Sequence, residues 1–178
     1  MKRIIAIPVF FLSLISSAVA ATLTGHVVGV TDGDTITVLD ANNQTHEVRL
    51  SNIDAPETSC HQRKPSNSDT CTETSQPFGK AAKQSLSAIL YDRDVQVSLE
   101  RGQSYGRVVG TVYVNRLDAN LEQIRSGYAW HYIQYAQRQQ DAITFNQYQK
   151  AEQAARTGHI GLWKDSNPVA PWNYRHAR

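Results

Sequence analysis

The sequence lacks several features that would point to common classes of protein. Among its 178 residues there are only two cysteines, Cys60 and Cys71, and they do not show the paired spacing of a zinc-binding motif. After the first twenty residues no segment is apolar enough to span a membrane, and no internal repeat is present. The sequence therefore argues against a paired-cysteine zinc fold, a membrane-spanning domain and a repeat protein.

Strong charge of one sign is also missing. The formal net charge is +2, but Lys2 and Arg3 lie in an N-terminal segment that we expect to be removed. Taking these two from the 18 basic residues leaves 16, against 16 acidic residues, so the mature chain is close to neutral. A basic surface therefore cannot explain nucleic-acid binding, and any contact with a polyanion must come from a few locally placed side chains.

The N-terminus has the pattern of a signal peptide. Lys2 and Arg3 form a basic start, residues 4–15 are mainly apolar, and Ala18-Val-Ala20 is the small-x-small pattern that signal peptidase cuts after. We expect cleavage after residue 20 and export to the periplasm or the medium, with no membrane association afterwards. The alternative is a permanent N-terminal anchor, for which the apolar run is short.

In an exported protein, a single pair of cysteines is most simply explained by a disulfide. A bond between Cys60 and Cys71 would close a short polar loop and stabilise the fold by at most about 3 kcal/mol on the chain-entropy model. A metal site made of these two thiols and His61 is the alternative, but it offers only three local ligands.

Periodicity predicts five short strands, with a helix between the third and the fourth. Alternating β-branched and apolar residues mark the strands, and an approximate helical stripe follows Pro77. Two further helices are expected before an aperiodic tail. The predicted strands are 26–30, 35–38, 47–53, 95–99 and 107–114, the predicted helices are 77–90, 120–126 and 141–157, and the tail is 164–178.

This order of elements predicts an α+β fold that is mainly β, with a five-stranded barrel of the OB type and about three helices. We expect residues 1–20 to be the signal peptide, 21–163 the barrel domain, and 164–178 a tail packed on the domain or trailing from it. Such barrels are used to bind oligonucleotides, but the fold alone does not establish a function.

Acidic residues at predicted strand ends are candidate metal ligands. Asp34 and Asp54 each lie beside a turn, and oxygen ligands without interleaved His or Cys suit Ca²⁺ or Mg²⁺. Pro56 favours an extended conformation for Ala55, whose carbonyl can then serve as a further ligand. The turn Asp32-Gly-Asp34 taken alone is equally typical of ordinary hairpin chemistry.

A third carboxylate and two arginines complete the parts needed for phosphodiester hydrolysis. Glu57 follows Asp54 by three residues and could orient or deprotonate a water, although an acidic surface turn has the same pattern. Arg49 and Arg107 carry planar forks of donors that match the oxygens of a phosphate. Each arginine taken alone is also compatible with an ordinary surface charge.

Together these residues resemble the staphylococcal (micrococcal) nuclease family, also called the thermonuclease family. Their order and spacing agree along essentially the whole mature chain. The matching blocks are Asp32-Gly-Asp34-Thr35, Arg49 to Thr58, Gln76-Pro-Phe-Gly79, Tyr105-Gly-Arg107, Gly161-Leu-Trp163, and the closing Asn167 to Trp172 with Arg175.

The resemblance implies a nuclease barrel that binds one Ca²⁺ ion. Asp34, Asp54 and the carbonyl of Ala55 would hold the ion, and Asp32 would lie in its outer shell. The enzyme would be a monomer that cleaves both DNA and RNA and leaves 3′-phosphate ends.

The resemblance also implies catalytic roles. Arg49 and Arg107 would grip the scissile phosphate, and Glu57 would act on the attacking water, either as general base or as its orienter. Tyr105, Tyr132 and Tyr135 are candidate substrate-binding residues, because a tyrosine can stack on a base or bond a phosphate. Aromatic residues as dense as those around Tyr132 and Tyr135 are equally typical of the edge of a core.

Some positions depart from the family pattern. Ser104 stands where the best-known members carry lysine, and Ala55 replaces a threonine at a position where the ligand is the backbone oxygen. The Cys60–Cys71 loop is longer than in the shortest members and would lie at the rim of the site.

The leading hypothesis is therefore an exported, Ca²⁺-dependent, sugar-non-specific nuclease. A catalytically inactive OB-type nucleic-acid-binding module is one alternative, although degenerate copies usually lose the arginines and carboxylates that this chain keeps. A calcium-binding envelope protein is the other alternative, and it would bind Ca²⁺ without any contribution from a nucleotide.

Overall fold

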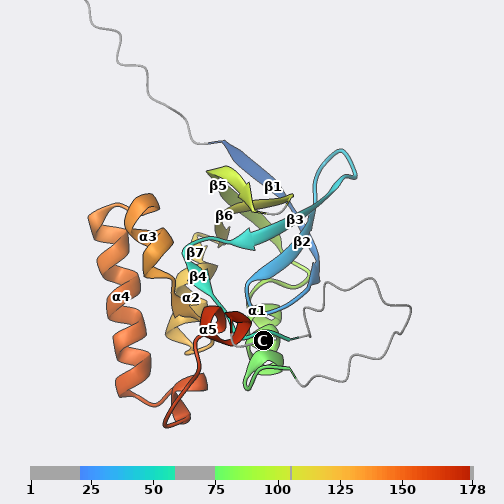
Figure 1. Cartoon of the computed structure of the whole chain (residues 1–178). Coiled ribbons are helices and arrows are strands. Elements are labelled where there is room, and N and C mark those ends of the chain that lie inside the picture. The colour runs from blue at the N-terminus through green and yellow to red at the C-terminus, as the bar shows by residue number, and fades with distance from the viewer. Residues whose placement is uncertain (1–20, 59–74, 105, 177–178) are drawn as a thin grey trace, which may run out of the picture.

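The computed structural model of the protein describes residues 21–58, 75–104 and 106–176 (Figure 1). The expected signal peptide, the expected Cys60–Cys71 disulfide and the candidate Tyr105 lie outside these residues. Within the described ranges, no helix combines the length and the hydropathy needed to cross a membrane.

Five strands form a closed mixed barrel, which confirms the predicted OB-type architecture. Along the sheet the strands follow the order β3-β2-β1-β5-β6, with antiparallel neighbours, and a parallel pairing of β3 with β6 closes the barrel. At the closure Val48 pairs with Val108 and Leu50 with Gly110. The strands are β1 (Thr22–Val30), β2 (Thr35–Leu39), β3 (Thr45–Leu50), β5 (Asp94–Ser104) and β6 (Arg107–Val114).

Side-chain alternation along the strands determines which residues fill the barrel. On β3, Val48 and Leu50 are fully buried, whereas Glu47 is exposed and Arg49 is only partly covered. This alternation agrees with the expectation from sequence, because successive side chains of a strand point to opposite faces. Arg49 therefore lies on the outer face of the barrel wall.

Three further strands have two residues each: β7 (Leu117–Asp118) adds to the barrel sheet beside β6, whereas β4 (Ile53–Asp54) and β8 (Trp130–His131) form a separate two-stranded sheet. Strand β4 pairs antiparallel with β8, so that Asp54 lies opposite Trp130. This pairing ties the end of the β3 segment to the helical part of the molecule.

The described residues contain five α-helices, two more than the sequence predicted. The three expected helices correspond to α1 (Gly79–Leu90), α2 (Ala119–Arg125) and α4 (Ala142–Thr157). The unexpected ones, α3 (Ile133–Gln139) and α5 (Pro171–His176), have only seven and six residues. Segments of two turns or fewer are too short to display a helical repeat, which explains why the pattern missed them.

The C-terminal segment folds back onto the domain. A 3₁₀ turn, η1 (Gly161–Lys164), places Leu162 and Trp163 in a second apolar cluster together with Trp130 and Ala170. Trp172 packs against this cluster. In Figure 1 helix α5 (red) lies below the barrel strands, between the labels of β4 and α1.

Candidate active site

Asp34 and Arg49 are brought together by the pairing of β2 with β3. Thr35, which follows Asp34, pairs with Arg49, and the N–H of Leu50 donates to the carbonyl of Asp34 over 2.8 Å. The backbone N–H of Asp34 donates to Oδ1 of Asp32 over 3.0 Å, so the turn before β2 holds both aspartates in place. These backbone contacts fix Asp34 next to the outward-pointing side chain of Arg49.

Arg49 lies between two buried carboxylates. Its Nη1 is 2.5 Å from Oδ2 of Asp34, and its Nη2 donates to Oδ1 of Asp54 over 2.8 Å. Burial alone would lower the pKa of Arg49, but the charges of Asp34 and Asp54 outweigh this effect and raise it. The two predicted metal ligands are therefore neighbours, and a permanent cation already bridges them.

Asp54 is completely buried, and its ionised form depends on the cations around it. Burial raises the pKa of Asp54, while the charge of Arg49 and the hydrogen bonds from Arg175 act in the opposite direction. The backbone N–H of Ala55 donates to Oδ2 of Asp34 over 2.7 Å. The predicted ligand triplet Asp34, Asp54 and Ala55 thus forms one connected group.

Asp32 lies in the same acidic group. Burial, followed by the negative charge of Asp34, raises the pKa of Asp32 to about 7. A positive charge nearby would favour the ionised form of Asp32.

Glu57 is fastened to the same end of the barrel by Gln76. The N–H of Glu57 donates to Oε1 of Gln76 over 3.1 Å, and the N–H of Gln76 donates back to the carbonyl of Glu57 over 3.1 Å. The side-chain amide of Gln76 also donates to the carbonyl of Val169 over 2.7 Å. Only 8% of Glu57 is exposed, so this carboxylate is held in a confined position.

Arg107 lies on the same outer face of the sheet as Arg49. Because Val48 pairs with Val108 in the parallel closure, Arg107 neighbours Glu47, and its Nε is 3.9 Å from Oε1 of that residue. Glu47 and Arg49 are two positions apart on β3 and therefore share a face. The barrel closure thus brings the second predicted phosphate-binding arginine to the rim of the site.

Sequence reasoning gave no role to Arg175, which reaches the centre of the site from α5. Its Nη2 donates to Oδ2 of Asp54 over 2.7 Å, and its Nη1 donates to Oε1 of Glu57 over 2.6 Å and to Oδ1 of Asp54 over 3.2 Å. Burial alone would lower the pKa of Arg175, but its bonds to the two carboxylates raise it. The only signal for this position was its place in the closing family-like block.

The two candidate tyrosines differ in their surroundings. The ring of Tyr132 stacks on Trp172 with centroids 5.0 Å apart and an interplanar angle of 6°, and it contacts Tyr135 at 4.7 Å. Burial, and next the charge of Asp54, raise the pKa of Tyr132, whereas Tyr135 is 57% exposed. Tyr132 is therefore the candidate that lies within electrostatic reach of the carboxylates.

The donor types fit a hard divalent cation. Among the described residues there is no cluster of three or more His, Cys, Asp or Glu side chains arranged as a metal site. The predicted set is smaller, with two adjacent carboxylates, Asp34 and Asp54, and one backbone oxygen, and it consists of the oxygen ligands that Ca²⁺ prefers. A phosphate oxygen and waters would supply the remaining ligands.

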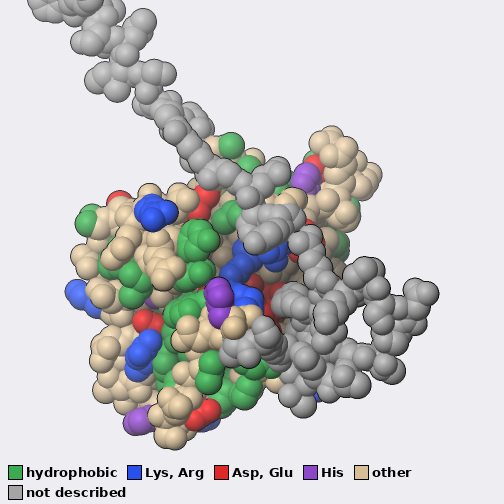
Figure 2. All heavy atoms as spheres, viewed as in Figure 1, with side chains coloured by type: hydrophobic (Ala, Val, Ile, Leu, Met, Phe, Trp, Pro, Cys, Tyr) green, Lys and Arg blue, Asp and Glu red, His purple; other side chains and the backbone are tan. Residues whose placement is uncertain are grey.

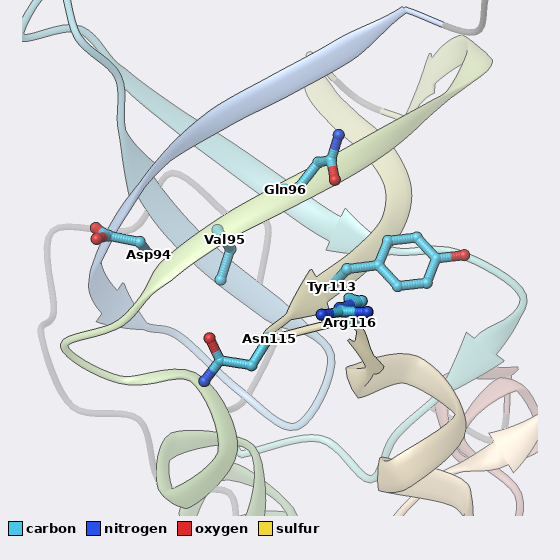
Figure 3. Close-up of a pocket in the computed structure, with 6 residues that line it drawn as sticks. All are labelled: Asp94, Val95, Gln96, Tyr113, Asn115 and Arg116. Carbon is cyan, nitrogen blue, oxygen red and sulfur yellow. The ribbon is translucent and has the colours of Figure 1, made fainter.

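Figure 2 shows basic and acidic side chains gathered near the middle of the face that α5 covers. A separate surface pocket of about 500 Å³ lies along β5 and the end of β6 (Figure 3). It shares no residue with the cluster of carboxylates and arginines. Its lining residues are Asp94, Val95, Gln96, Tyr113, Asn115 and Arg116.

Comparison with known proteins establishes the family. Residues 47–165 match the family model described as staphylococcal nuclease homologue. The chain belongs to the staphylococcal nuclease family. This family assignment makes the protein a nuclease of the hydrolase class, as the sequence motifs predicted.

Several bacterial relatives of this nuclease align over most of their length. A Haemophilus influenzae protein named as an uncharacterized endonuclease is 36% identical, over 85% of this chain and 72% of its own. The micrococcal nuclease of Shigella flexneri is 34% identical, over 92% of this chain and 87% of its own. An Escherichia coli protein named as an uncharacterized endonuclease is 31% identical, over the full length of both chains.

Proposed function

We propose that this nuclease is an exported, Ca²⁺-dependent enzyme that hydrolyses both DNA and RNA to products ending in 3′-phosphate. The observation that carries the proposal is the cluster in which Arg49 lies between Asp34 and Asp54, with Glu57 joined to Asp54 through Arg175. An ordinary structural site has little need for so many ionised groups at one barrel end, because each buried charge requires compensation.

The carboxylates are proposed to hold the metal ion. Asp34, Asp54 and the backbone oxygen of Ala55 would be direct ligands, and Asp32 would bind through water. A bound Ca²⁺ ion supplies positive charge that offsets the negative charge growing on the phosphate oxygens. Burial of Asp34 and Asp54 strengthens such an interaction, because a less polar surrounding screens charge less than water does.

The arginines are proposed to hold the scissile phosphate. Arg49 and Arg107 lie on one face of the barrel wall, and a guanidinium fork can donate two parallel hydrogen bonds to phosphate oxygens. Donors that are already oriented stabilise the transition state with little reorganisation. A nearly neutral mature chain fits this arrangement, since the local cluster and not the whole surface would bind the polyanion.

Glu57 is proposed to act on the attacking water. Its backbone is held by Gln76, and its carboxylate shares Nη1 of Arg175 with Asp54, so it lies beside the proposed metal ligand. It would either take the proton of the water or orient the water for attack.

The test is a cleavage assay on single-stranded DNA and on RNA with purified variants of the mature chain. Glu57→Ala and Arg107→Ala should lose cleavage by orders of magnitude, and EGTA should abolish cleavage by the wild type. Arg125→Ala is the matched control, because the Arg125 side chain is about half exposed and its ion-pair partner is Glu122, which is not a proposed site residue. Undiminished cleavage by both site variants would overturn the assignment.

Export is proposed from the N-terminal pattern alone. Expression of the full chain in a bacterium should give a periplasmic or secreted protein whose first residue, measured by mass spectrometry, is Ala21. A cytoplasmic protein that keeps residues 1–20 would overturn this part of the proposal.

A further inference from the structure

Helix α5 covers the two parts of the site that a metal ion and a nucleotide would occupy. Arg175 contacts both oxygens of Asp54 and one oxygen of Glu57. Three residues earlier on the same helix, Trp172 stacks on the ring of Tyr132. One six-residue element therefore holds both the acidic group and the candidate base-stacking ring.

The charge of Arg175 is placed where a divalent cation would compete with it. Asp54 has its two oxygens engaged by Arg175, and Oδ1 also accepts from Arg49. A cation bound to Asp54 would lie within a few ångströms of the Arg175 guanidinium, where like charges repel strongly in a partly buried site. Simultaneous binding of the cation and Arg175 to Asp54 is therefore disfavoured. Arg49 reaches only Oδ1, whereas Arg175 occupies both oxygens, so Arg175 is the cation that the ion would have to replace.

The contact between Tyr132 and Trp172 occupies the place of a nucleotide base, as Arg175 occupies the place of a cation. The rings of Tyr132 and Trp172 are nearly parallel, at 6°, so the indole covers one face of the tyrosine. A base that stacked on that face would have to replace the indole. The nucleotide and the metal ion would thus displace the same helix.

The attachment of α5 to the rest of the fold suits a movable element. Its first residue, Pro171, and the preceding Ala170 are buried, and Gln76 bonds the carbonyl of Val169, so the start of the helix is fixed. Beyond this point Trp172 is only partly buried and Arg175 is exposed by 36% of its side chain. Displacing Arg175 and Trp172 would separate Trp172 from Trp130 and the second apolar cluster, but it would leave the barrel core intact, because neither residue belongs to that core.

We propose that Arg175 is a further residue of the site, an internal counter-ion for Asp54 and Glu57 that a divalent cation replaces. Helix α5 then acts as a clasp that is closed without the cation and opens when cation and nucleotide bind. This inference rests on the proposed function, because it takes Asp54 to be a metal ligand.

The primary test is calorimetric titration of Ca²⁺ into the mature chain. Arg175→Gln should bind Ca²⁺ about tenfold more tightly than the wild type, because the competing charge is gone. Arg125→Gln is the matched control and should bind as the wild type does. Unchanged or weaker binding by Arg175→Gln would overturn the clasp.

Asp54→Asn separates the clasp from the function on which it rests. If Asp54→Asn loses Ca²⁺ binding while Arg175→Gln shows no gain, the metal site stands and the clasp alone is overturned. If Asp54→Asn keeps wild-type affinity, the metal assignment is overturned and the clasp with it. Circular dichroism should show that both variants are folded.

Tryptophan fluorescence gives a second readout that needs no catalytic turnover. Saturating Ca²⁺ with a nucleoside bisphosphate should change the emission of the wild type as Trp172 leaves Tyr132. The change should be largely lost in Trp172→Phe. An emission spectrum that ligands leave unaltered in the wild type would contradict opening of the clasp.

Discussion

Nη2 of Arg49 donates to Oδ1 of the fully buried Asp54 over 2.8 Å, which joins the proposed phosphate clamp directly to a proposed metal ligand. Burial raises the pKa of Asp54, and the positive charge of Arg49 lowers it, so replacing Arg49 would alter the ionisation of Asp54. The phosphate-binding and metal-binding parts of the site are therefore one electrostatic unit.

The first prediction is that Arg49→Lys is strongly impaired. Lysine keeps the positive charge but has a single ammonium group, which cannot reach Asp34 and Asp54 together or bind two phosphate oxygens with a planar fork. We expect kcat/KM to fall by about 10²-fold or more, the range for losing one preorganised donor. Arg125→Lys is the control. Near-normal turnover of Arg49→Lys would argue against direct phosphate contact.

The second prediction concerns the close approach of α1 to the Glu57 loop. A Cβ built on Gly79 would lie 2.1 Å from the carbonyl oxygen of Glu57, so a side chain there forces the backbone apart. Gly79→Ala should lower the free energy of unfolding by about 1–3 kcal/mol, as overpacking does, and should also reduce activity. Denaturant unfolding measures the first effect and the cleavage assay the second.

Gly29→Ala is the matched control for this substitution. A Cβ on Gly29 would meet Thr37 at no less than 3.4 Å, which is an ordinary contact. Gly29→Ala should therefore lower the free energy of unfolding clearly less than Gly79→Ala does. Equal unfolding free energies for the two variants would show that the approach of α1 to Glu57 is not constrained as the structure indicates.

The third prediction is a loss of stability at mildly acidic pH that depends on His131. Burial lowers the pKa of this ring from its ordinary value of 6.5, although its contact with Gln140 acts against the change. The unfolded chain therefore takes up the proton first. The stability that the neutral His131 ring contributes to the folded chain is therefore complete above pH 6.5. It is lost as the pH falls towards the lower pKa of the ring in the folded chain.

Unfolding free energies measured across this pH range should show a weaker dependence for His131→Gln than for the wild type. His26 provides a contrast, because its hydrogen bonds to Asp94 and Asp92 raise its pKa. Its contribution is present below the unfolded pKa and is lost as the pH rises through the folded one. An unchanged slope for His131→Gln would refute the assignment to this ring.

The fourth prediction follows from mass action. If Ca²⁺ binds only the folded chain, a concentration 100 times its Kd should add about 2.7 kcal/mol to the free energy of unfolding. Thermal unfolding with Ca²⁺ and with EGTA measures the shift. Asp54→Asn should show none, and a full shift in that variant would place the ion elsewhere.

The barrel and its principal helices could be predicted because their patterns are long enough to repeat. The buried apolar side chains alternate along β2 and β3, and α4 spans 16 residues after Asp141, whose side chain accepts from the N–H groups of Ile143 and Thr144. Local propensity and tertiary packing agree in these elements, so the sequence is sufficient.

The part of the site that escaped prediction depends on contacts between distant segments. Arg175 and Asp54 are 121 residues apart, and α5 has only six residues, so neither spacing nor periodicity indicates their contact. The family-like block around Arg175 showed that the position belongs to a motif, but not what it touches. Only the packing of Trp172 and Ala170 against the second apolar cluster brings the arginine to the carboxylates.

The last prediction separates the two candidate tyrosines. The charge of Asp54 contributes to the raised pKa of Tyr132, so the two side chains are close. The backbone N–H of Tyr132 also donates to the carbonyl of Asn52 over 2.9 Å, which holds Tyr132 near the carboxylates. Tyr135 projects more of its ring to solvent and touches Tyr132 from outside. If the base stacks on Tyr132, Tyr132→Ala should raise KM for single-stranded DNA by about tenfold, since one stacked base contributes about 1–3 kcal/mol.

Tyr135→Ala should change KM much less, which makes it the internal control for this measurement. Because Tyr132 also packs on Trp172, its replacement should at the same time abolish the ligand-dependent change in tryptophan emission. A variant that loses the emission change but keeps its KM would show that Tyr132 serves the C-terminal helix and not the substrate. The two measurements together therefore distinguish a stacking platform from a packing residue.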